Sequence, residues 1–360
     1  MTKLSDLPLR ESLIGKEPYG APMDPVPIAL NVNENTHPVP QAVIAEITQK
    51  ISESLTKANR YPDREAVQLR EAIAGYLGYG LTSKQVWAAN GSNEILQQVL
   101  QAFGGPGRSL MSFTPTYSMY PILASNTDTE WIAVGRQADF KLTPEYVKDA
   151  ILKHSPAIVI LCSPNNPTGT TIDAETIIAA YEAFDGMLVI DEAYAEFDNK
   201  NPSAISLLEG RPRLIVSRTM SKAFAFAGVR LGYLAADAAV IDALRLVRLP
   251  YHLSLLTQTA ATVAVQHSRD MLETVADIRG QRERMAEELT ALGYKVHESG
   301  ANFLLVSGFQ SPEATFETLL KKGILIRNLS IPGSLRITAG TEEETTALIN
   351  AITELGPAGA

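Results

Sequence analysis

Between residues 85 and 237, short apolar runs alternate with longer amphipathic stretches, and this alternation limits the possible fold more than any other feature. The apolar runs are QVWAA, SLMSF, EWIAV, AIVILCS, MLVIDEA, RLIVSRT and LGYLAA. Strands that are apolar along most of their length are typical of a parallel sheet covered by helices on both faces. One intervening stretch, NEILQQVLQAF, has its apolar residues at helical spacing. We therefore expect an α/β fold with a mainly parallel central sheet flanked by helices.

The pattern changes after about residue 255, where a long charge-rich helical stretch is followed by FLLVS, ILIRN and SLRITAG. The last helix should begin at Thr341, which can form a capping box with Glu344. These features predict a smaller α+β domain at residues 261–360, next to a large domain at 46–260. Residues 1–45 are rich in proline and weakly periodic, so we expect an arm that lies over the body and joins the small domain.

Composition excludes several classes of protein. The 360 residues carry a net charge of −9 without any run of Lys or Arg, which disfavours a nucleic-acid partner. The apolar runs are too short for a membrane span, and the N-terminus lacks the layout of a signal peptide. The five histidines do not have zinc-binding spacing, so we expect no metal site. The single cysteine, Cys162, fits a reducing cytoplasmic location, and we expect a small core residue rather than a nucleophile.

Four polar motifs directly follow predicted strands, where open α/β sheets build their binding sites. In the first, ANGSNE, residues Gly91, Ser92 and Asn93 precede a helix, and free N–H groups at a helix N-terminus can bind a phosphate. A plain helix cap by Ser92 or Asn93 is the alternative for this motif alone. A P-loop or a G-x-G-x-x-G motif after a strand is missing from the sequence, which argues against a nucleotide.

The second and third motifs provide amide, carboxyl and phenol groups. In SPNNPTG, Asn166 lies in a turn fixed by prolines. In VIDEAY, Asp191 ends an apolar strand, and a buried carboxylate requires a cation or several donors. Tyr194 could direct its hydroxyl into the same cleft, whereas we expect Glu192 to lie exposed in a loop.

The fourth motif is RTMSKAFAFAGVR, in which Lys222 follows the RLIVS strand. A lysine in a partly dry cleft near cations loses proton affinity and becomes a nucleophilic amine. Thr219, Ser221 and Arg230 can all donate hydrogen bonds to a phosphate. An ordinary solvated lysine is the alternative for this motif taken alone.

Together the motifs require one ligand with a phosphate, a carbonyl within reach of Lys222 and a basic ring nitrogen for Asp191. Pyridoxal 5′-phosphate has all three groups. Asp191 would keep the ring nitrogen protonated, so that the ring accepts electrons. Asn166 and Tyr194 would hydrogen-bond its phenolic oxygen, and Lys222 would bond to its aldehyde.

A family resemblance agrees with this ligand. NGSNE, PTYSMY, SPNNPTG, VIDEAY, RTMSKAFAFAGVRLGY and LRITAG occur in this order and together resemble the fold-type I aminotransferases, which depend on pyridoxal 5′-phosphate. With RYPD upstream and LPYHLS downstream, the sequence is most similar to the histidinol-phosphate aminotransferase family. The similarity covers nearly the whole chain, and it implies a homodimer with shared active sites.

The resemblance also implies roles that spacing does not show. Tyr117 would stack on the cofactor ring, and Arg336 would fix the substrate carboxylate. Tyr61 would reach the cofactor phosphate of the neighbouring subunit; the alternative is a tyrosine that packs ahead of the helix capped by Asp63. Tyr19 would close over the site.

The implied reaction is transamination between L-histidinol phosphate and 2-oxoglutarate, giving imidazole acetol phosphate and L-glutamate in histidine biosynthesis. Arg336, helped by Arg327, suits both the phosphate and the carboxylate. The predicted imidazole slot is lined by Tyr19, Tyr117, Tyr251 and Asn93, whereas we expect His252 to be structural.

Three other functions remain open on the sequence. An aromatic aminotransferase acting on phenylalanine would use the same tyrosine-lined slot and anion-binding arginine. A decarboxylase or lyase would need the same cofactor motifs, since these do not fix the reaction type. A non-catalytic binding protein is disfavoured, because binding alone requires neither Lys222 nor Asp191.

Overall fold

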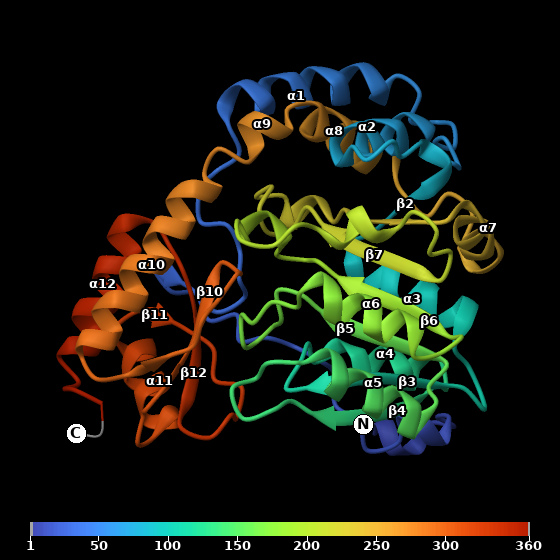
Figure 1. The fold of residues 1–360 in the computed structure, drawn as a ribbon. Helices are drawn as coiled ribbons and strands as arrows, with labels where there is room; N and C mark the ends of the chain where they lie inside the picture. The colour runs from blue at the N-terminus through green and yellow to red at the C-terminus, as the bar shows by residue number, and fades with distance from the viewer. Residues whose placement is uncertain (1–2, 359–360) are drawn as a thin grey trace.

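The computed structural model describes residues 3–358, and its centre is a seven-stranded sheet (Figure 1). The strand order is β2-β8-β7-β6-β5-β3-β4, and only β8 runs antiparallel to its neighbours within the described sheet. The strands are β2 (Val86–Ala89), β3 (Ser109–Thr114), β4 (Glu130–Gly135), β5 (Ile158–Cys162), β6 (Met187–Asp191), β7 (Leu214–Thr219) and β8 (Gly232–Ala236). The predicted mainly parallel sheet is confirmed.

Helices cover both faces of this sheet. Neighbouring residues of one strand point to opposite faces, so Ile190 packs in one core cluster and Val189 in the other. This is why the strands had to be apolar along their length. One face is covered by α2 (Val67–Leu77), α5 (Pro144–His154), α6 (Ala174–Glu182) and α8 (Leu255–Gln266), and the other by α3 (Ser92–Phe103), α4 (Met119–Asn126) and α7 (Ala238–Val247).

A second, smaller unit has its own core and lies beside the sheet (Figure 1). Its three-stranded antiparallel sheet has β10 between β12 and β9. The elements are α10 (Val275–Ala291), β9 (Lys295–Val296), β10 (Phe303–Ser307), α11 (Pro312–Lys321), β11 (Ile324–Leu325), β12 (Ser334–Thr338) and α12 (Glu342–Thr353). The predicted capping box of α12 is present, because Thr341 N donates to Glu344 Oε2 at 2.8 Å and Glu344 N donates to Thr341 Oγ1 at 3.2 Å.

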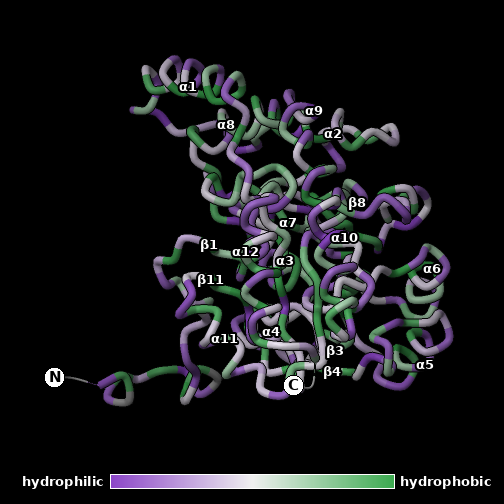
Figure 2. Tube along the Cα trace, turned by 90° about the vertical axis from the view of Figure 1, so that its left-hand side faces the viewer, coloured by the Kyte–Doolittle hydropathy of each residue, from purple (hydrophilic) through white to green (hydrophobic). Residues whose placement is uncertain are grey.

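The N-terminal segment connects the two units. Strand β1 (Ile28–Ala29) pairs in parallel with β11, and Leu30 is buried in the core of the small unit. Helix α1 (Gln41–Leu55) then packs on the large unit and contacts α8. From residue 3 onward, the start of the described chain extends away from the body along its lower edge (Figure 2).

The predicted domain boundary at residue 260 is misplaced. Helix α8 continues through that position to Gln266, and Ala261 and Ala264 pack in the large core. Short helix α9 (Ser268–Met271) still belongs to this side, whereas the small core begins at Val275. The change of sequence texture near residue 255 marks the start of a helix rather than the start of a domain. In the described residues, no helix has the length and apolarity needed to cross a membrane.

Candidate active site

A cavity of about 510 Å³ lies where β5, β6 and β7 end, between the large unit, the N-terminal segment and the small unit. Carboxyl ends of parallel strands meet at one edge of a sheet, so motifs far apart in the sequence come together here. Thirteen of the predicted site residues line it: Tyr19, Ser92, Asn93, Tyr117, Asn166, Asp191, Tyr194, Thr219, Ser221, Lys222, Arg230, Arg327 and Arg336.

Lys222 lies in the turn after β7 and reaches into this cavity. Its Nζ donates a 2.7 Å hydrogen bond to the carbonyl oxygen of Val32 in the N-terminal segment. Burial, and then repulsion by the guanidinium of Arg336, lower the pKa of the Lys222 amine to about 8. About a tenth of this amine is therefore neutral and nucleophilic at pH 7, a far larger share than for an ordinary lysine.

Asp191 is 2% exposed at the end of β6. Its Oδ2 accepts a 2.7 Å hydrogen bond from Tyr120 Oη, while its Oδ1 has no hydrogen-bond partner among residues 3–358. Burial raises the pKa of the Asp191 carboxyl to about 6, although the Tyr120 hydrogen bond opposes this rise. A cationic nitrogen placed at Oδ1 would satisfy the free oxygen and restore the charged form.

Tyr120 is a site residue that the sequence analysis missed. It is fully buried on α4, three residues after Tyr117, and its ring lies edge-on to that of Tyr117 with centroids 5.5 Å apart. The signal was available in the motif PTYSMY, since a buried carboxylate at Asp191 needs a donor and a tyrosine can supply one.

The turn before α3 provides an anion cradle. Gly91 occupies the N-cap position with φ +83°, so the alternative in which Ser92 or Asn93 caps the helix is wrong. A Cβ at Gly91 would lie 2.6 Å from Arg230 Nη2, so a glycine is needed for Arg230 to approach the helix N-terminus. Backbone N–H groups of the first turn and a guanidinium thus meet at one place, as phosphate binding requires.

Two hydroxyls complete this cradle. Thr219 Oγ1 donates to Ser221 Oγ at 3.0 Å, and Arg230 Nη1 lies 3.5 Å from the same Ser221 oxygen. Both hydroxyls line the cavity and are almost fully buried. Four predicted phosphate-binding groups therefore lie within one part of the cavity.

The hydroxyl of Tyr194 is held by two amides. It accepts hydrogen bonds from Asn33 Nδ2 at 3.0 Å and from Asn166 Nδ2 at 3.4 Å, which leaves its own proton free to be donated. Burial raises the pKa of this phenol above its ordinary value, so it stays protonated. Asn33 belongs to the N-terminal segment, and the sequence analysis did not assign it to the site.

Tyr117 and Asn93 form a second polar edge of the cavity. Tyr117 Oη donates to Asn93 Oδ1 at 3.2 Å. Burial raises the pKa of Tyr117 to about 12, so this phenol also remains neutral. A neutral aromatic face with a polar rim suits a flat heterocycle.

Two arginines form the cationic end of the cavity. Arg336 on β12 is 5% exposed, and it donates from Nη1 to Asn166 Oδ1 at 2.6 Å and from Nη2 to the carbonyl of Asn31 at 2.5 Å. The backbones of Arg327 and Arg336 form an antiparallel bridge, which places the two side chains together. Arg327 Nη1 is buried and without a partner in the described part of the chain. An anionic group would satisfy it.

Two predicted residues lie elsewhere. Tyr61 is 80% exposed and stacks on Tyr251, with ring centroids 4.4 Å apart and an angle of 14° between the planes. Neither ring lines the cavity of its own chain, so Tyr251 does not contribute to the slot where it was expected. His252 accordingly has a structural position, with Nε2 2.9 Å from the carbonyl of Ala88 and its ring stacked on Trp87.

Two expectations about residues near the strand ends had different outcomes. Cys162 is 2% exposed, and burial raises the pKa of its thiol to about 12, so it is a poor nucleophile as expected.

The expectation that Glu192 is exposed is wrong, because it is 4% exposed. It points into the large unit and accepts two hydrogen bonds from the Arg218 guanidinium, which offsets the cost of burying its charge.

An α/β fold with a lysine, an aspartate and an anion cradle at the strand ends defines a class of protein. Residues 25–352 match the family "Aminotransferase class I and II", and the chain belongs to this family. It is therefore a transaminase, and the family cofactor is pyridoxal 5′-phosphate.

Relatives about half identical to this chain share the name of one enzyme within this family. The chain is 53% identical over 359 residues to a "Histidinol-phosphate aminotransferase" of Paenarthrobacter aurescens, covering 99% of this chain and 96% of the relative. It is 52% identical over 342 residues to the protein of the same name from Thermobifida fusca, covering 95% and 93%. The fold is shared with histidinol-phosphate aminotransferase from Sinorhizobium meliloti in complex with pyridoxal 5′-phosphate, with a TM-score of 0.81, 23% identity and 92% of each chain covered.

The cavity fits this cofactor on its own geometry. The partnerless Asp191 Oδ1 suits the ring nitrogen, the cradle at Gly91 and Arg230 suits the phosphate, and the Lys222 amine suits the aldehyde. The three features lie in one cavity that is large enough for a cofactor and a small substrate together.

Proposed function

We propose that this chain catalyses transamination between L-histidinol phosphate and 2-oxoglutarate, forming imidazole acetol phosphate and L-glutamate in the cytoplasm. The observation that carries this proposal is that two arginines, Arg336 and Arg327, line the same cavity as the phosphate cradle. Arg336 is already hydrogen-bonded twice, and Arg336 Nε and Arg327 Nη1 are both buried without a partner in the described residues. One guanidinium suffices for a carboxylate, and a second suits a phosphate, which carries more charge.

The residues of the cavity divide the chemistry among them. Bound pyridoxal 5′-phosphate supplies an aldehyde that bonds to amines and a ring that withdraws electrons from the substrate. Lys222 Nζ would be the base that takes the Cα proton of the substrate, and afterwards the acid that gives this proton to the carbon that was the cofactor's aldehyde. Its lowered pKa of about 8 suits both roles near neutral pH.

Asp191 and Tyr194 control protons around the ring. Asp191 would hold the ring nitrogen in its protonated form through Oδ1, while Tyr120 keeps Oδ2 in place. Tyr194 would donate its free proton to the phenolic oxygen, since Asn33 and Asn166 already donate to the tyrosine hydroxyl. Tyr117 provides the aromatic surface for the ring.

Substrate binding alternates between two anions in one place. L-Histidinol phosphate presents a phosphate-bearing arm where glutamate presents its α-carboxylate, so Arg336 and Arg327 serve both half-reactions. The imidazole would lie near Tyr19, Tyr117 and Asn93, which line the cavity. Tyr19 is half exposed on the N-terminal segment, a position from which it can cover a bound substrate.

A homodimer with shared active sites belongs to the same proposal. Several large apolar side chains are exposed near the stacked tyrosines: Tyr61 (80%), Leu246 (86%), Leu249 (76%), Leu256 (44%) and Tyr251 (40%). Exposed large apolar side chains of this kind are typical of a subunit interface. In a dimer, Tyr61 would reach the phosphate of the neighbouring cofactor and Tyr251 the neighbouring substrate slot.

Subunit mixing tests the shared sites. Lys222→Ala and Tyr61→Ala chains are inactive or weak alone if the proposal holds, but mixed dimers should regain activity in one of their two sites. Equal activity before and after mixing, with dimers confirmed by sedimentation, would exclude a shared site.

Initial rates test the reaction itself. The kcat/KM for histidinol phosphate with 2-oxoglutarate should exceed that for phenylalanine by about tenfold to a hundredfold or more, the discrimination that one additional charge-assisted contact provides. Double-reciprocal lines should be parallel, as in a ping-pong reaction. Equal kcat/KM values would favour the aromatic aminotransferase, and release of CO₂ would favour a decarboxylase.

A further inference from the structure

Three charged side chains form a buried cluster behind the cavity, in a part of the molecule that the proposed chemistry does not use. Arg218 donates from Nε and Nη2 to Glu192 Oε2, at 3.0 and 2.8 Å, and from Nη1 to Glu196 Oε1 at 3.1 Å. The three side chains are at most 10% exposed. One guanidinium therefore binds two carboxylates inside the large unit.

The three charged residues are close in sequence to residues that line the cavity. Glu192 directly follows Asp191, and Glu196 is two residues after Tyr194. Arg218 directly precedes Thr219, in the segment that leads to Lys222. Successive residues of an extended backbone point to opposite sides, so Glu192 and Arg218 face the core while their neighbours Asp191 and Thr219 face the cavity. Glu196 lies in the short 3-10 helix Ala195–Phe197 that follows β6.

We infer that Arg218 is a positioning residue, which fixes the β6 end carrying Asp191 and Tyr194 against the β7 end carrying Thr219 and Lys222. The two strands are neighbours in the sheet, but their regular pairing ends at Asp191 and Ser217. Beyond that point the backbone bond from Glu192 N to Ser217 O continues the contact for one residue. The guanidinium extends it further, by bonds to both ends of the Glu192–Glu196 segment.

Further contacts hold the cluster rigid. Glu192 also accepts hydrogen bonds from Ser203 Oγ at 2.7 Å and from the backbone N–H of Ala204 at 2.6 Å. Glu196 Oε1 lies 3.4 Å from the hydroxyl of Tyr76 on α2. The carboxylates are therefore tied to two separate parts of the large unit, the Ser203–Ala204 segment and α2, and Arg218 joins them.

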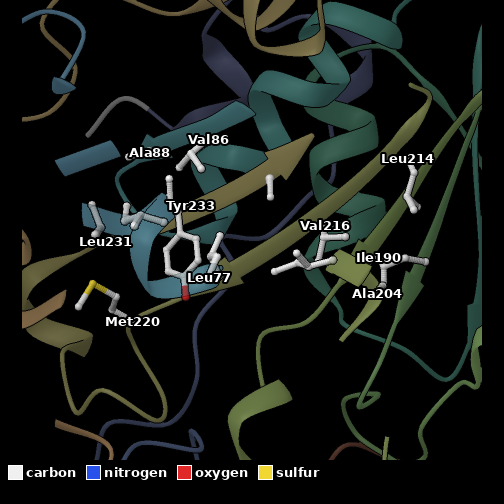
Figure 3. Close-up of a cluster of buried hydrophobic side chains, with 14 of the residues drawn as sticks. Leu77, Val86, Ala88, Ile190, Ala204, Leu214, Val216, Met220, Leu231 and Tyr233 are labelled. Carbon is white, nitrogen blue, oxygen red and sulfur yellow. The ribbon is translucent and has the colours of Figure 1, made fainter. Parts of the chain in front are cut away.

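The surroundings make this arrangement costly, which argues that it serves more than stability. Arg218 lies beside Tyr233 on the next strand, and Figure 3 shows the Tyr233 ring among apolar side chains such as Leu77, Leu231 and Met220. Buried ion pairs are often no more stabilising than apolar residues of similar volume, but they fix direction and distance. Fixed distance is what a rigid ligand requires, because Asp191 and Lys222 must bind atoms at opposite ends of one ring.

The inference rests on the transamination proposed above, but its test does not need the substrate. Arg218→Met is compared with Arg70→Met in the cofactor-loaded protein. Arg70 is a matched control, since it is 3% exposed on α2 and donates to the carbonyl oxygens of Val86 and Ser83, away from the cavity. Both substitutions remove a buried guanidinium and both should lower the unfolding temperature.

The decisive readout is the pH titration of the visible absorption of the bound cofactor. For Arg218→Met we expect its midpoint to shift by about one pH unit or more and the cofactor Kd to rise about tenfold or more, because a misplaced Asp191 or Lys222 changes both. With substrate, kcat should fall by a larger factor than KM changes. Arg70→Met should keep the parental midpoint, cofactor Kd and kcat.

Glu192→Gln provides a second variant if Arg218→Met does not fold, since it removes one charge and preserves shape. It should shift the same midpoint in the same direction. A parental midpoint and cofactor Kd in whichever of the two variants folds, with only a lower unfolding temperature, would overturn the inference. A shifted midpoint in a protein that does not transaminate histidinol phosphate would instead preserve the inference and refute the proposed substrate.

Discussion

Tyr120 Oη donates a 2.7 Å hydrogen bond to Asp191 Oδ2, and the two residues are 71 positions apart in the chain. This bond leaves Asp191 Oδ1 as a buried oxygen without a partner within residues 3–358, next to the cavity. Tyr120 therefore does two things: it fixes the rotation of the carboxyl group, and it stabilises the charged form. The first prediction follows from this relationship.

Tyr120→Phe should raise the pKa of Asp191 above its present value of about 6, because the substitution removes the hydrogen bond that opposes the burial effect. The acidic limb of the pH profile of kcat/KM should then move to higher pH, by up to about one unit for one lost charge-assisted bond. Tyr146→Phe is the control, since its hydroxyl donates to the carbonyl of Gly135 on the surface. An unmoved acidic limb would show that Tyr120 only packs.

Asp191→Asn should stabilise the cofactor-free protein while abolishing turnover. The pKa of Asp191 is raised from 3.8 to about 6, so between these values the folded chain binds more protons than the unfolded chain and stability falls as pH rises. Above about pH 6 the full penalty is present, and it amounts to at most about 3 kcal/mol. Denaturant unfolding of the cofactor-free proteins at pH 5 and pH 7.5 measures this. The gain in the free energy of unfolding on Asp191→Asn should be larger at pH 7.5 than at pH 5. A loss of stability at both pH values would contradict the raised pKa of Asp191.

Lys222→Ala should abolish transamination, because the amine is both the point of cofactor attachment and the proton carrier. The cofactor should still bind, since the cradle at α3 and Arg230 is intact, but borohydride should no longer link it to the protein. Mass spectrometry of the reduced protein measures the link. A covalent adduct that persists would place the attachment on another amine.

The reactivity of Lys222 has its own pH dependence. Its amine has a pKa of about 8 in the cofactor-free chain, lowered from 10.5 chiefly by burial. Acylation of Lys222 by a small reagent should therefore reach half of its maximal rate near pH 8 in the folded chain, whereas in the chain unfolded by denaturant it should follow ordinary lysine behaviour. Peptide mass spectrometry at several pH values compares the two. Equal profiles would contradict the lowered pKa.

Arg327→Gln should separate the two candidate substrates. Loss of a charge-assisted contact costs about 1.5–3 kcal/mol, so kcat/KM for histidinol phosphate should fall about tenfold to a hundredfold or more. For phenylalanine the fall should be within about threefold, because Arg336 alone can bind a carboxylate. Arg336→Gln should lower kcat/KM for both substrates. Equal losses for both substrates in Arg327→Gln would refute a phosphate-specific role.

Gly232 is not among the residues that line the cavity, but Gly232→Ala should weaken cofactor binding. A Cβ at Gly232 on β8 would lie 2.3 Å from the backbone of Gly91 and Ser92, so the turn that forms the phosphate cradle must move. We expect the cofactor Kd to rise about tenfold and stability to fall by about 1–3 kcal/mol, as in other overpacked cores. Gly280→Ala is the control, because its Cβ would have no described atom within 4 Å on the surface of α10. Unchanged cofactor binding in Gly232→Ala would argue against the cradle.

The strands and the motifs that follow them could be predicted from the sequence, because both depend on neighbouring residues. Apolar runs define β3 to β8, and a polar group just after such a run lies at the strand end whatever the rest of the chain does. This reasoning placed Lys222, Asp191 and Asn166 correctly in one cavity. Arg336 was placed there through the family resemblance rather than through spacing.

The pattern of residues along the sequence could not predict contacts between segments that are far apart in the chain. Glu192 looks like an exposed loop acid until Arg218, 26 positions later, is found beside it. Asn33 and Tyr120 contact the site only because the N-terminal segment and α4 pack there. The end of the large unit was misjudged for the same reason, since α8 has no local feature that says which core it joins.

By itself, then, the order of the residues determined the secondary structure, the edge of the sheet that binds ligands and the groups able to react there. Tertiary structure decided which side chains orient those groups, how far their pKa values move and where the stacked pair Tyr61 and Tyr251 lies. The physical reason is that side-chain alternation is a property of adjacent residues, whereas burial and hydrogen bonding depend on whatever other segments pack nearby.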